Sequence, residues 1–188
     1  MVDILIIDND IPLILQNHEN GLSHIKKIST RRTLEKEEFI AAFNVARRLE
    51  REHPILLKAI GWYSKGKVSN NTLDSFLAYW NAIEITATQY HTQTERTRNG
   101  AINKVYQCFL DYFGDENLWD VHGRWINEMH EKRSRIAHGA EETTVEAIND
   151  VSNLIPKLAS VSRKLIYAVL GSNYDQNIFE QESWGVHF

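Results

Sequence analysis

The sequence predicts a mainly helical protein that carries a small β-hairpin at its N-terminus. Apolar residues recur at helical spacing from Thr33 onward, whereas short β-branched runs lie within the first thirty residues. No internal repeat or linker divides the 188 residues, a length that suits one well-buried core. We therefore expect a β element at residues 1–30 and a single helical domain at residues 31–188.

Composition and charge are ordinary for a soluble globular domain. Hydrophobic residues make up 43% and charged residues 24%, and the formal net charge is -4. This balance argues against binding nucleic acid through bulk charge, although it allows a local basic cleft. The single cysteine, Cys108, excludes an intrachain disulfide and fits a reducing compartment. No apolar run reaches the roughly 20 residues that span a bilayer, and the start MVDILIIDND lacks a signal peptide's basic region. We expect a cytoplasmic protein without membrane contact.

The predicted hairpin rests on two β-branched runs, DILII at residues 3–7 and IPLIL at residues 11–15. The turn-prone residues 8–10, Asp-Asn-Asp, separate the two runs. Pro12 cannot donate a hydrogen bond to a neighbouring strand, so the second run would form an edge strand.

Six helices are expected after the hairpin. The first begins near Thr33 and places one set of apolar residues on a single face: Phe39, Ala42, Phe43, Ala46 and Leu49. The others are predicted at residues 55–64, 72–90, 100–112, 116–137 and 143–170.

Local signals mark the ends of these helices. Pro54 suits the first position of the second helix and Gly66 closes it, Asn70, Asn71 or Thr72 caps the third, Gly114 stops the fourth, and Gly139 follows the fifth. Thr143 and Glu146 form a capping box for the sixth, which Pro156 is expected to kink or break. The tail at residues 171–188 shows no usable period.

Two charged residues border apolar stripes on the third and fifth helices. These stripes are expected to form core: Phe76, Trp80, Ile83, Ala87 and Tyr90 on the third, and Leu118, Val121, Trp125 and Met129 on the fifth. Glu84 lies one turn after Trp80, and Arg133 one turn after Met129. Because a buried charge needs a partner, we expect the two helices to pack together and Glu84 to pair with Arg133 or Arg135.

The stretch EKRSRIAHGA, residues 131–140, is the main candidate site. Two explanations stand open: a solvated helix end, where cations favour the negative pole of the helix dipole, or a site that binds phosphate and moves protons. The R-x4-H spacing of Arg133 and His138 is weak evidence alone, because Arg48 and His53 share it. On an ideal helix the two side chains lie about 140° apart, so they converge only if the helix ends at His138 or a second subunit completes the site.

The setting of this pair resembles the HEPN superfamily, and within it the Apea-like HEPN domains. In that family a helix reading roughly F-L-x-x-W-x-A-x-E precedes a helix that ends R-[NS]-[KR]-hydrophobic-x-H-G. The matching residues here are Phe76, Leu77, Trp80, Ala82 and Glu84, followed by Arg133, Ser134, Arg135, Ile136, His138 and Gly139. The resemblance covers about residues 70–170.

This resemblance implies a HEPN-like helical bundle that dimerises through its motif-bearing helices. Many members are metal-independent RNA endonucleases, used in toxin–antitoxin or antiviral defence systems, in which two R-x4-6-H motifs face each other across the dimer. Others have lost catalysis and act as binding or regulatory modules. Catalytic members favour asparagine or another polar residue directly after the arginine, and Ser134 keeps the polarity without the amide.

RNA cleavage needs a base for the 2′-hydroxyl, an acid for the leaving oxygen and cations for the phosphate. We assign His138 as the acid/base and Arg133 as the phosphate clamp. Arg135 is a helper or substrate contact, and Ser134 and Glu84 orient the site. No cofactor is expected, and no metal site, because His122, His130 and His138 recur every eight residues and turn about 80° each time.

These interpretations also predict the partners of the protein. A homodimer, an RNA substrate and a protein partner or antitoxin are expected. Arg96, Arg98 and Lys104 are candidates for contacting RNA, with a solvated loop as the alternative. Three classes remain open: a ribonuclease, a catalytically silent HEPN dimer, and a plain helical scaffold.

Overall fold

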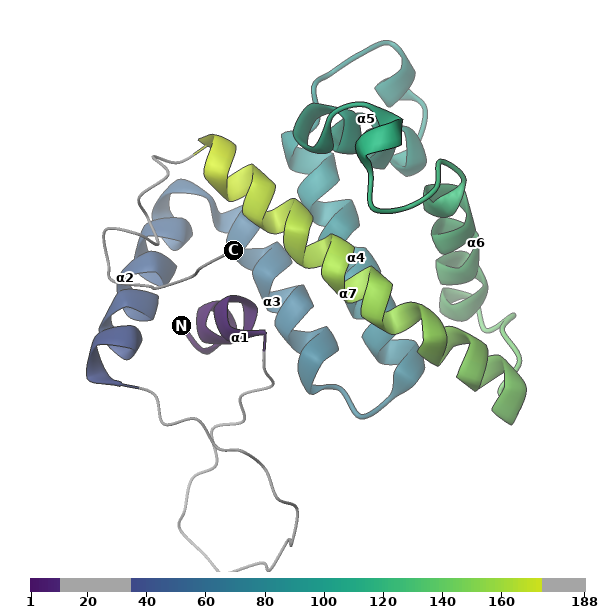
Figure 1. Ribbon diagram of the computed structural model, residues 1–188, viewed down its shortest axis with the longest axis horizontal. Coiled ribbons are helices and arrows are strands. Elements are labelled where there is room, and N and C mark those ends of the chain that lie inside the picture. The colour runs from purple at the N-terminus through teal and green to yellow at the C-terminus, as the bar shows by residue number, and fades with distance from the viewer. Residues whose placement is uncertain (11–34, 174–188) are drawn as a thin grey trace, which may run out of the picture.

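A computed structural model of the chain describes residues 1–10 and 35–173, and it is mainly helical in those ranges (Figure 1). Its elements are α1 (Val2–Asn9), α2 (Lys36–Glu52), α3 (Pro54–Val68), α4 (Thr72–Tyr90), η1 (Arg96–Arg98), α5 (Ala101–Phe113), η2 (Glu116–Leu118), α6 (Trp125–Ala137) and α7 (Val145–Asn173). The predicted helical bundle is therefore confirmed. No strand occurs in the two described ranges, and no helix there is long and apolar enough to cross a bilayer.

Helix α4 lies at the centre of the bundle. It packs along α3 and α7 and also contacts α5 and α6. Figure 1 shows α7 crossing the face formed by α3 and α4, with α1 and α2 on one side and α5 and α6 on the other. The side chains of Phe76, Trp80 and Ile83 on α4 are almost completely buried, so this helix forms much of the core.

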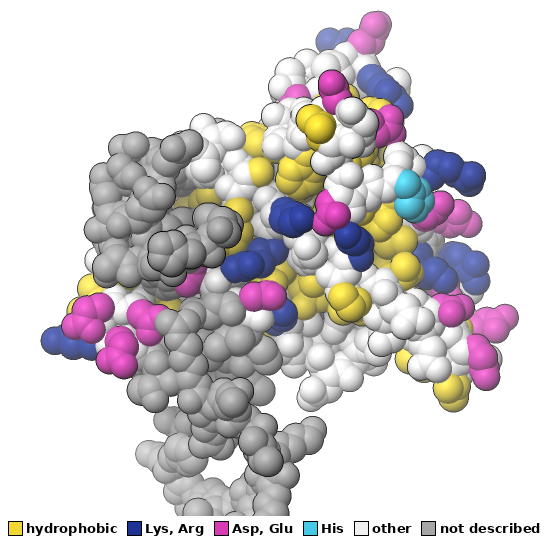
Figure 2. All heavy atoms as spheres, in the orientation of Figure 1, with side chains coloured by type: hydrophobic (Ala, Val, Ile, Leu, Met, Phe, Trp, Pro, Cys, Tyr) yellow, Lys and Arg dark blue, Asp and Glu magenta, His cyan; other side chains and the backbone are white. Residues whose placement is uncertain are grey.

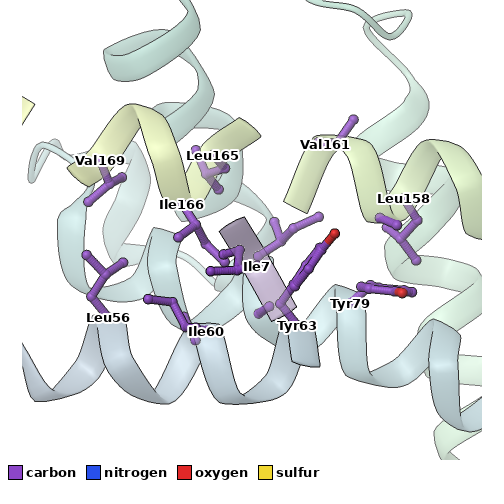
Figure 3. Packing of buried hydrophobic residues seen from close by; sticks show 14 of the residues in the cluster. Ile7, Leu56, Ile60, Tyr63, Tyr79, Leu158, Val161, Leu165, Ile166 and Val169 are labelled. Carbon is purple, nitrogen blue, oxygen red and sulfur yellow. The ribbon is translucent and has the colours of Figure 1, made fainter. Parts of the chain in front are cut away.

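The predicted first strand is wrong, because residues 2–9 form α1. Its four central residues, Ile4, Leu5, Ile6 and Ile7, are all buried. The spacing of apolar residues distinguishes a helix from a strand only when one side of the element faces solvent. This short run is buried on all sides, so its spacing gives no such signal, and packing selects the helix. Figure 3 shows Ile7 between Ile60 and Tyr63 of α3 and Ile166 of α7. The second predicted strand, at residues 11–15, lies outside the described residues.

Residues from α3 and α7 hold the C-terminal end of α1. Arg163 donates from Nε to the carbonyl of Ile7 over 2.7 Å and from a terminal nitrogen to the carbonyl of Asp8 over 2.6 Å. These carbonyls lack partners within their own helix, and a cation at this pole also favours the helix dipole.

Asp10 follows the end of α1 in a left-handed conformation, with φ 52°. It accepts a hydrogen bond from the Tyr63 hydroxyl, and Lys67 Nζ lies 2.8 Å from its Oδ1. Burial alone would raise the pKa of this carboxyl, but the bonds from Lys67 and Tyr63 outweigh burial and lower the pKa. The turn after α1 is therefore fixed to α3.

The buried face of α2 differs in part from the prediction. A capping box starts the helix: the Glu38 side chain accepts from the Glu35 backbone N–H over 2.9 Å. Phe39 and Phe43 are 46% and 49% exposed, whereas the residues that face the core are Ala41, Ala42, Val45 and Leu49. Small side chains allow α2 to approach α1 and α3, and the larger aromatic rings lie outside this contact.

Gly66 does not end the second predicted helix, because α3 continues to Val68. A Cβ atom on Gly66 would lie 2.8 Å from the ring of Tyr79, which is itself 2% exposed. The glycine is therefore needed for the close approach of α3 and α4 and not for a turn.

The predicted fifth helix is interrupted between η2 and α6. The Trp119 ring turns inward, where its Nε1 donates to the carbonyl of Gly114 over 2.9 Å and the ring makes a T-shaped contact with Phe109, while Leu118 is 68% exposed. Burying Trp119 in this way is incompatible with one continuous helix.

The start of α7 differs from the prediction. Thr144 rather than Thr143 caps the helix, since its Oγ1 accepts from the N–H of Ala147 over 3.2 Å. The helix continues through Pro156 without a break. The predicted ends at Asn71, Gly100, Gly114 and Gly139 are confirmed.

We expect Arg163→Met to lower the free energy of unfolding by about 2–4 kcal/mol, because two carbonyls at the buried end of α1 lose charged donors. Urea unfolding followed by circular dichroism measures this difference. Lys164→Met, at the next position but on an exposed side chain, should leave the transition close to wild type. Equal effects of the two substitutions would contradict the role given to Arg163.

Gly66→Ala should destabilise the protein by about 1–3 kcal/mol, because the added methyl group overlaps the Tyr79 ring. The same substitution at Gly171 meets no atom within 4 Å and should be neutral or stabilising by up to about 1 kcal/mol. Thermal unfolding of the two variants compares one chemical change in two environments. A stable Gly66→Ala variant would show that α3 and α4 can separate.

Candidate functional site

Glu84 lies at the seam between α4 and α6. Its side chain is 16% exposed, and the same helix buries Trp80 and Ile83 completely or nearly so. A carboxylate in this position has little contact with water and requires charged or hydrogen-bonding neighbours. The α6 helix supplies them.

Two side chains of α6, one helical turn apart, face the Glu84 carboxylate. Arg133 NH2 lies 3.6 Å from Oε2, and His130 Nδ1 lies 3.7 Å from Oε1. The predicted contact between the two helices and the pairing of Glu84 with Arg133 are thus confirmed. Both distances exceed those of ordinary hydrogen bonds, so the attraction between Arg133 and Glu84 is mainly Coulombic.

Several nitrogens near this seam have unused hydrogen-bonding capacity. Arg133 Nε, His130 Nδ1 and Trp80 Nε1 are buried without a hydrogen-bond partner in the described part of the chain. The rings of Trp80 and His130 lie 6.2 Å apart, so the histidine packs against the indole. Small movements that shorten the contacts to Glu84 would satisfy the arginine and histidine donors.

The α6 helix ends at Ala137, as the sequence predicts, and His138 is its C-cap residue. The His138 N–H donates to the carbonyl of Ser134 over 3.0 Å, and Gly139 follows with φ 68°. His138 is exposed, whereas Arg133 is partly buried against α4. The structure shows no direct contact between these two side chains within the chain it describes. The Ser134 side chain is partly exposed, and its predicted role stays a prediction.

Arg135 pairs with a residue that the sequence analysis did not single out. After Gly139 the chain turns back, and the N–H groups of Ala140 and Glu141 donate to the Arg135 carbonyl. The Glu141 side chain, 5% exposed, lies 3.1 Å from both Arg135 Nε and Lys132 Nζ. Arg135 is therefore paired with Glu141 in the turn after Gly139 and is not the partner of Glu84.

The three candidate RNA contacts separate into two environments. Arg96 lies over the Tyr106 ring, with its guanidinium carbon 4.8 Å from the ring centre. Arg98 and Lys104 line a polar pocket of about 460 Å³ formed by the end of α4, η1 and the first turn of α5. The sequence could place these cations in one loop, but not on one pocket.

The surface over α6 mixes both signs of charge. Figure 2 shows Lys and Arg side chains next to Asp and Glu side chains on the side where α6 lies. No group of three histidine, cysteine, aspartate or glutamate side chains in the described ranges could hold a metal ion. Burial raises the pKa of the Cys108 thiol, which stays protonated and unreactive.

Local patterns could have identified His130 and Glu141. His130 precedes Arg133 by one turn, so any helix that directs Arg133 at Glu84 also directs His130 there. Glu141 follows a glycine that reverses the chain, next to a helix end rich in cations. A search limited to the R-x4-H spacing misses both residues.

Comparison of the chain with protein-family models, with curated proteins and with solved structures found no match.

The Glu84–Arg133 contact should contribute about 1 kcal/mol of coupling, because both side chains are partly shielded from water. Urea unfolding of Glu84→Ala, Arg133→Ala and the double variant measures this coupling. The exposed pair Arg48–Glu52, with side chains 45% and 46% exposed, provides the control cycle and should give about 0.3–0.5 kcal/mol. A coupling at Glu84 no larger than the control would assign the seam to apolar packing alone.

Proposed function

We propose that this protein is a HEPN-type RNA endonuclease that acts without a metal ion, in a toxin-like or defence-like role in the cytoplasm. The observation that carries the proposal is the arrangement at the end of α6. Glu84 holds Arg133 at the seam with α4, and His138 lies exposed at the helix end, five residues further along the chain. The sequence FLAYWNAIE and the sequence RSRIAHG of the resemblance meet at this seam.

The chemistry requires only groups that the chain supplies. An imidazole can accept the 2′-hydroxyl proton or protonate the leaving 5′-oxygen near neutral pH. A guanidinium can bind the nonbridging oxygens and stabilise the charge that develops on phosphorus. The Arg133 side chain is 32% exposed, so part of it remains open to a ligand beside Glu84.

One chain offers one motif, so the proposed reaction uses two copies. A symmetric dimer that joins the ends of two α6 helices would bring together two His138 imidazoles, one as base and one as acid, and two Arg133 guanidiniums. Such an arrangement also removes the difficulty that Arg133 and His138 point in different directions on one helix.

A catalytically silent HEPN dimer that binds a protein or RNA partner is the second candidate. The observation that favours it is that both arginines already have an acidic partner within the chain: Arg133 faces Glu84 and Arg135 faces Glu141. Ser134 in place of the favoured asparagine points the same way. In this case the same surface would bind without cutting.

Cleavage of a labelled mixed-sequence RNA in excess EDTA tests the proposal. Wild-type protein should cut the RNA, leave its 2′-deoxy analogue intact, and lose at least about 100-fold in rate on His138→Ala. His122→Ala is the matched control, because His122 is 63% exposed and lies outside the motif.

Equal losses in the two histidine variants would exclude a specific role for His138. If folded wild-type protein at micromolar concentration cuts no RNA, the silent dimer becomes the better assignment. Sedimentation analysis of the same samples then decides whether a dimer exists at all.

A further inference from the structure

A second polar site lies at the junction of α4 and α5. Its pocket of about 460 Å³ is lined by eight residues, all of them polar or charged: Thr88, His91, Gln93, Thr94, Glu95, Thr97, Arg98 and Lys104. The lining contains no aliphatic side chain and no phenylalanine, tyrosine or tryptophan ring. A lining of polar and charged side chains favours a charged, hydrophilic ligand over an apolar one.

The charges of the lining favour an anion. Arg98 and Lys104 contribute two cations against the single carboxylate of Glu95. Neither cation has an ion pair with another described residue, in contrast to Arg133, Arg135 and Lys132 on α6. Among the described residues, the lining of the pocket therefore carries one more positive than negative charge.

The fold adds a conflict that an anion would relieve. Lys104 lies in the first turn of α5, a helix that has no acidic residue in this turn and no side-chain cap at Gly100. A cation at this end of a helix opposes the helix dipole. Unfavourable local choices of this kind occur where a site is maintained for function, and a phosphate bound in the pocket would offset the charges of Lys104 and Arg98.

The walls of the pocket are held in place by hydrogen bonds. Thr94 and Thr97 exchange bonds, since the N–H of each donates to the Oγ1 of the other over 2.9 Å and 3.3 Å, and Thr97 is 3% exposed. The N–H of Thr92 donates to Asp111 on α5 over 2.6 Å. These hydrogen bonds fix the backbone around Arg98, so the backbone of the site requires little ordering when a ligand binds.

His91 supplies a further directed group. Its Nδ1 lies 2.7 Å from the carbonyl of Ala87, and because a carbonyl only accepts, Nδ1 carries a proton. The remaining ring nitrogen, Nε2, is therefore left to interact with a ligand, as an acceptor when the ring is neutral and as a donor when it is charged. Together with Thr88 and Gln93, it provides partners for a sugar hydroxyl.

We propose that this pocket binds the sugar–phosphate backbone of single-stranded RNA, with Arg98 and Lys104 on a phosphate and His91 on the neighbouring sugar. The inference rests on the proposed ribonuclease function, because it names a second contact for the same substrate. The polar lining favours the backbone over the bases, so this contact would hold a strand of any sequence. It would act at a distance from the reacting phosphate, as a positioning site.

Fluorescence anisotropy with a short labelled single-stranded RNA tests the proposal. All proteins carry His138→Ala, so that the RNA stays intact. Arg98→Ala/Lys104→Ala should weaken binding at least about tenfold and reduce the slope of log K against log salt by about 0.7, as the loss of one phosphate contact requires. Arg47→Ala/Arg51→Ala removes the same charge from exposed residues of α2 and should change the Kd by less than about twofold.

Three outcomes would overturn the proposal: equal weakening by the two double variants, no RNA binding by the parent protein, or displacement of the RNA by 5′-AMP at micromolar concentration, which would define a mononucleotide pocket. RNA cleavage is measured separately, in proteins that keep His138. Binding that depends on Arg98 and Lys104 without any cleavage would remove the nuclease and keep the pocket. RNA cleavage together with RNA binding that does not depend on Arg98 and Lys104 would keep the nuclease and remove the pocket.

Discussion

The enclosure of α4 is the constraint on which the rest of the structure depends. This helix contacts α3, α5, α6 and α7, and its largest side chains are almost completely buried. A helix surrounded in this way can carry a charge only where it meets water or a cation. Glu84 lies at that edge, and α6 therefore has to present Arg133 and His130 to it. The place of the candidate site follows from the packing of the core.

Features set by neighbouring residues could be read from the sequence, and features set by distant contacts could not. Asn71, Gly100 and Gly114 mark helix ends through local chemistry, and the structure has them there. The helical state of α1 depends instead on enclosure by α2 and α3 and on the hydrogen bonds from Arg163 of α7, and the break before α6 depends on the burial of Trp119. In neither case does the sequence of the segment itself carry the information.

The same division applies to the site. A carboxylate beside a buried tryptophan requires a cation, so Glu84 and an arginine of α6 could be paired in advance. The choice of Arg133 over Arg135 could not, because it depends on Glu141 reaching back to Arg135 after the turn at Gly139. The grouping of Arg98 and Lys104 with His91 likewise arises only when the end of α4 meets the start of α5.

The capture of α1 by Arg163 imposes an order on folding during synthesis. The arginine lies 156 residues after the Ile7 carbonyl that it binds, so α1 leaves the ribosome long before its partner exists. Until then an apolar segment with three isoleucines and a leucine stays without its final neighbours, which favours association with a chaperone or another chain. Closure of so long a loop also slows the last step of folding, and a translating ribosome that stalls before α7 would release a chain unable to bury its own N-terminal helix.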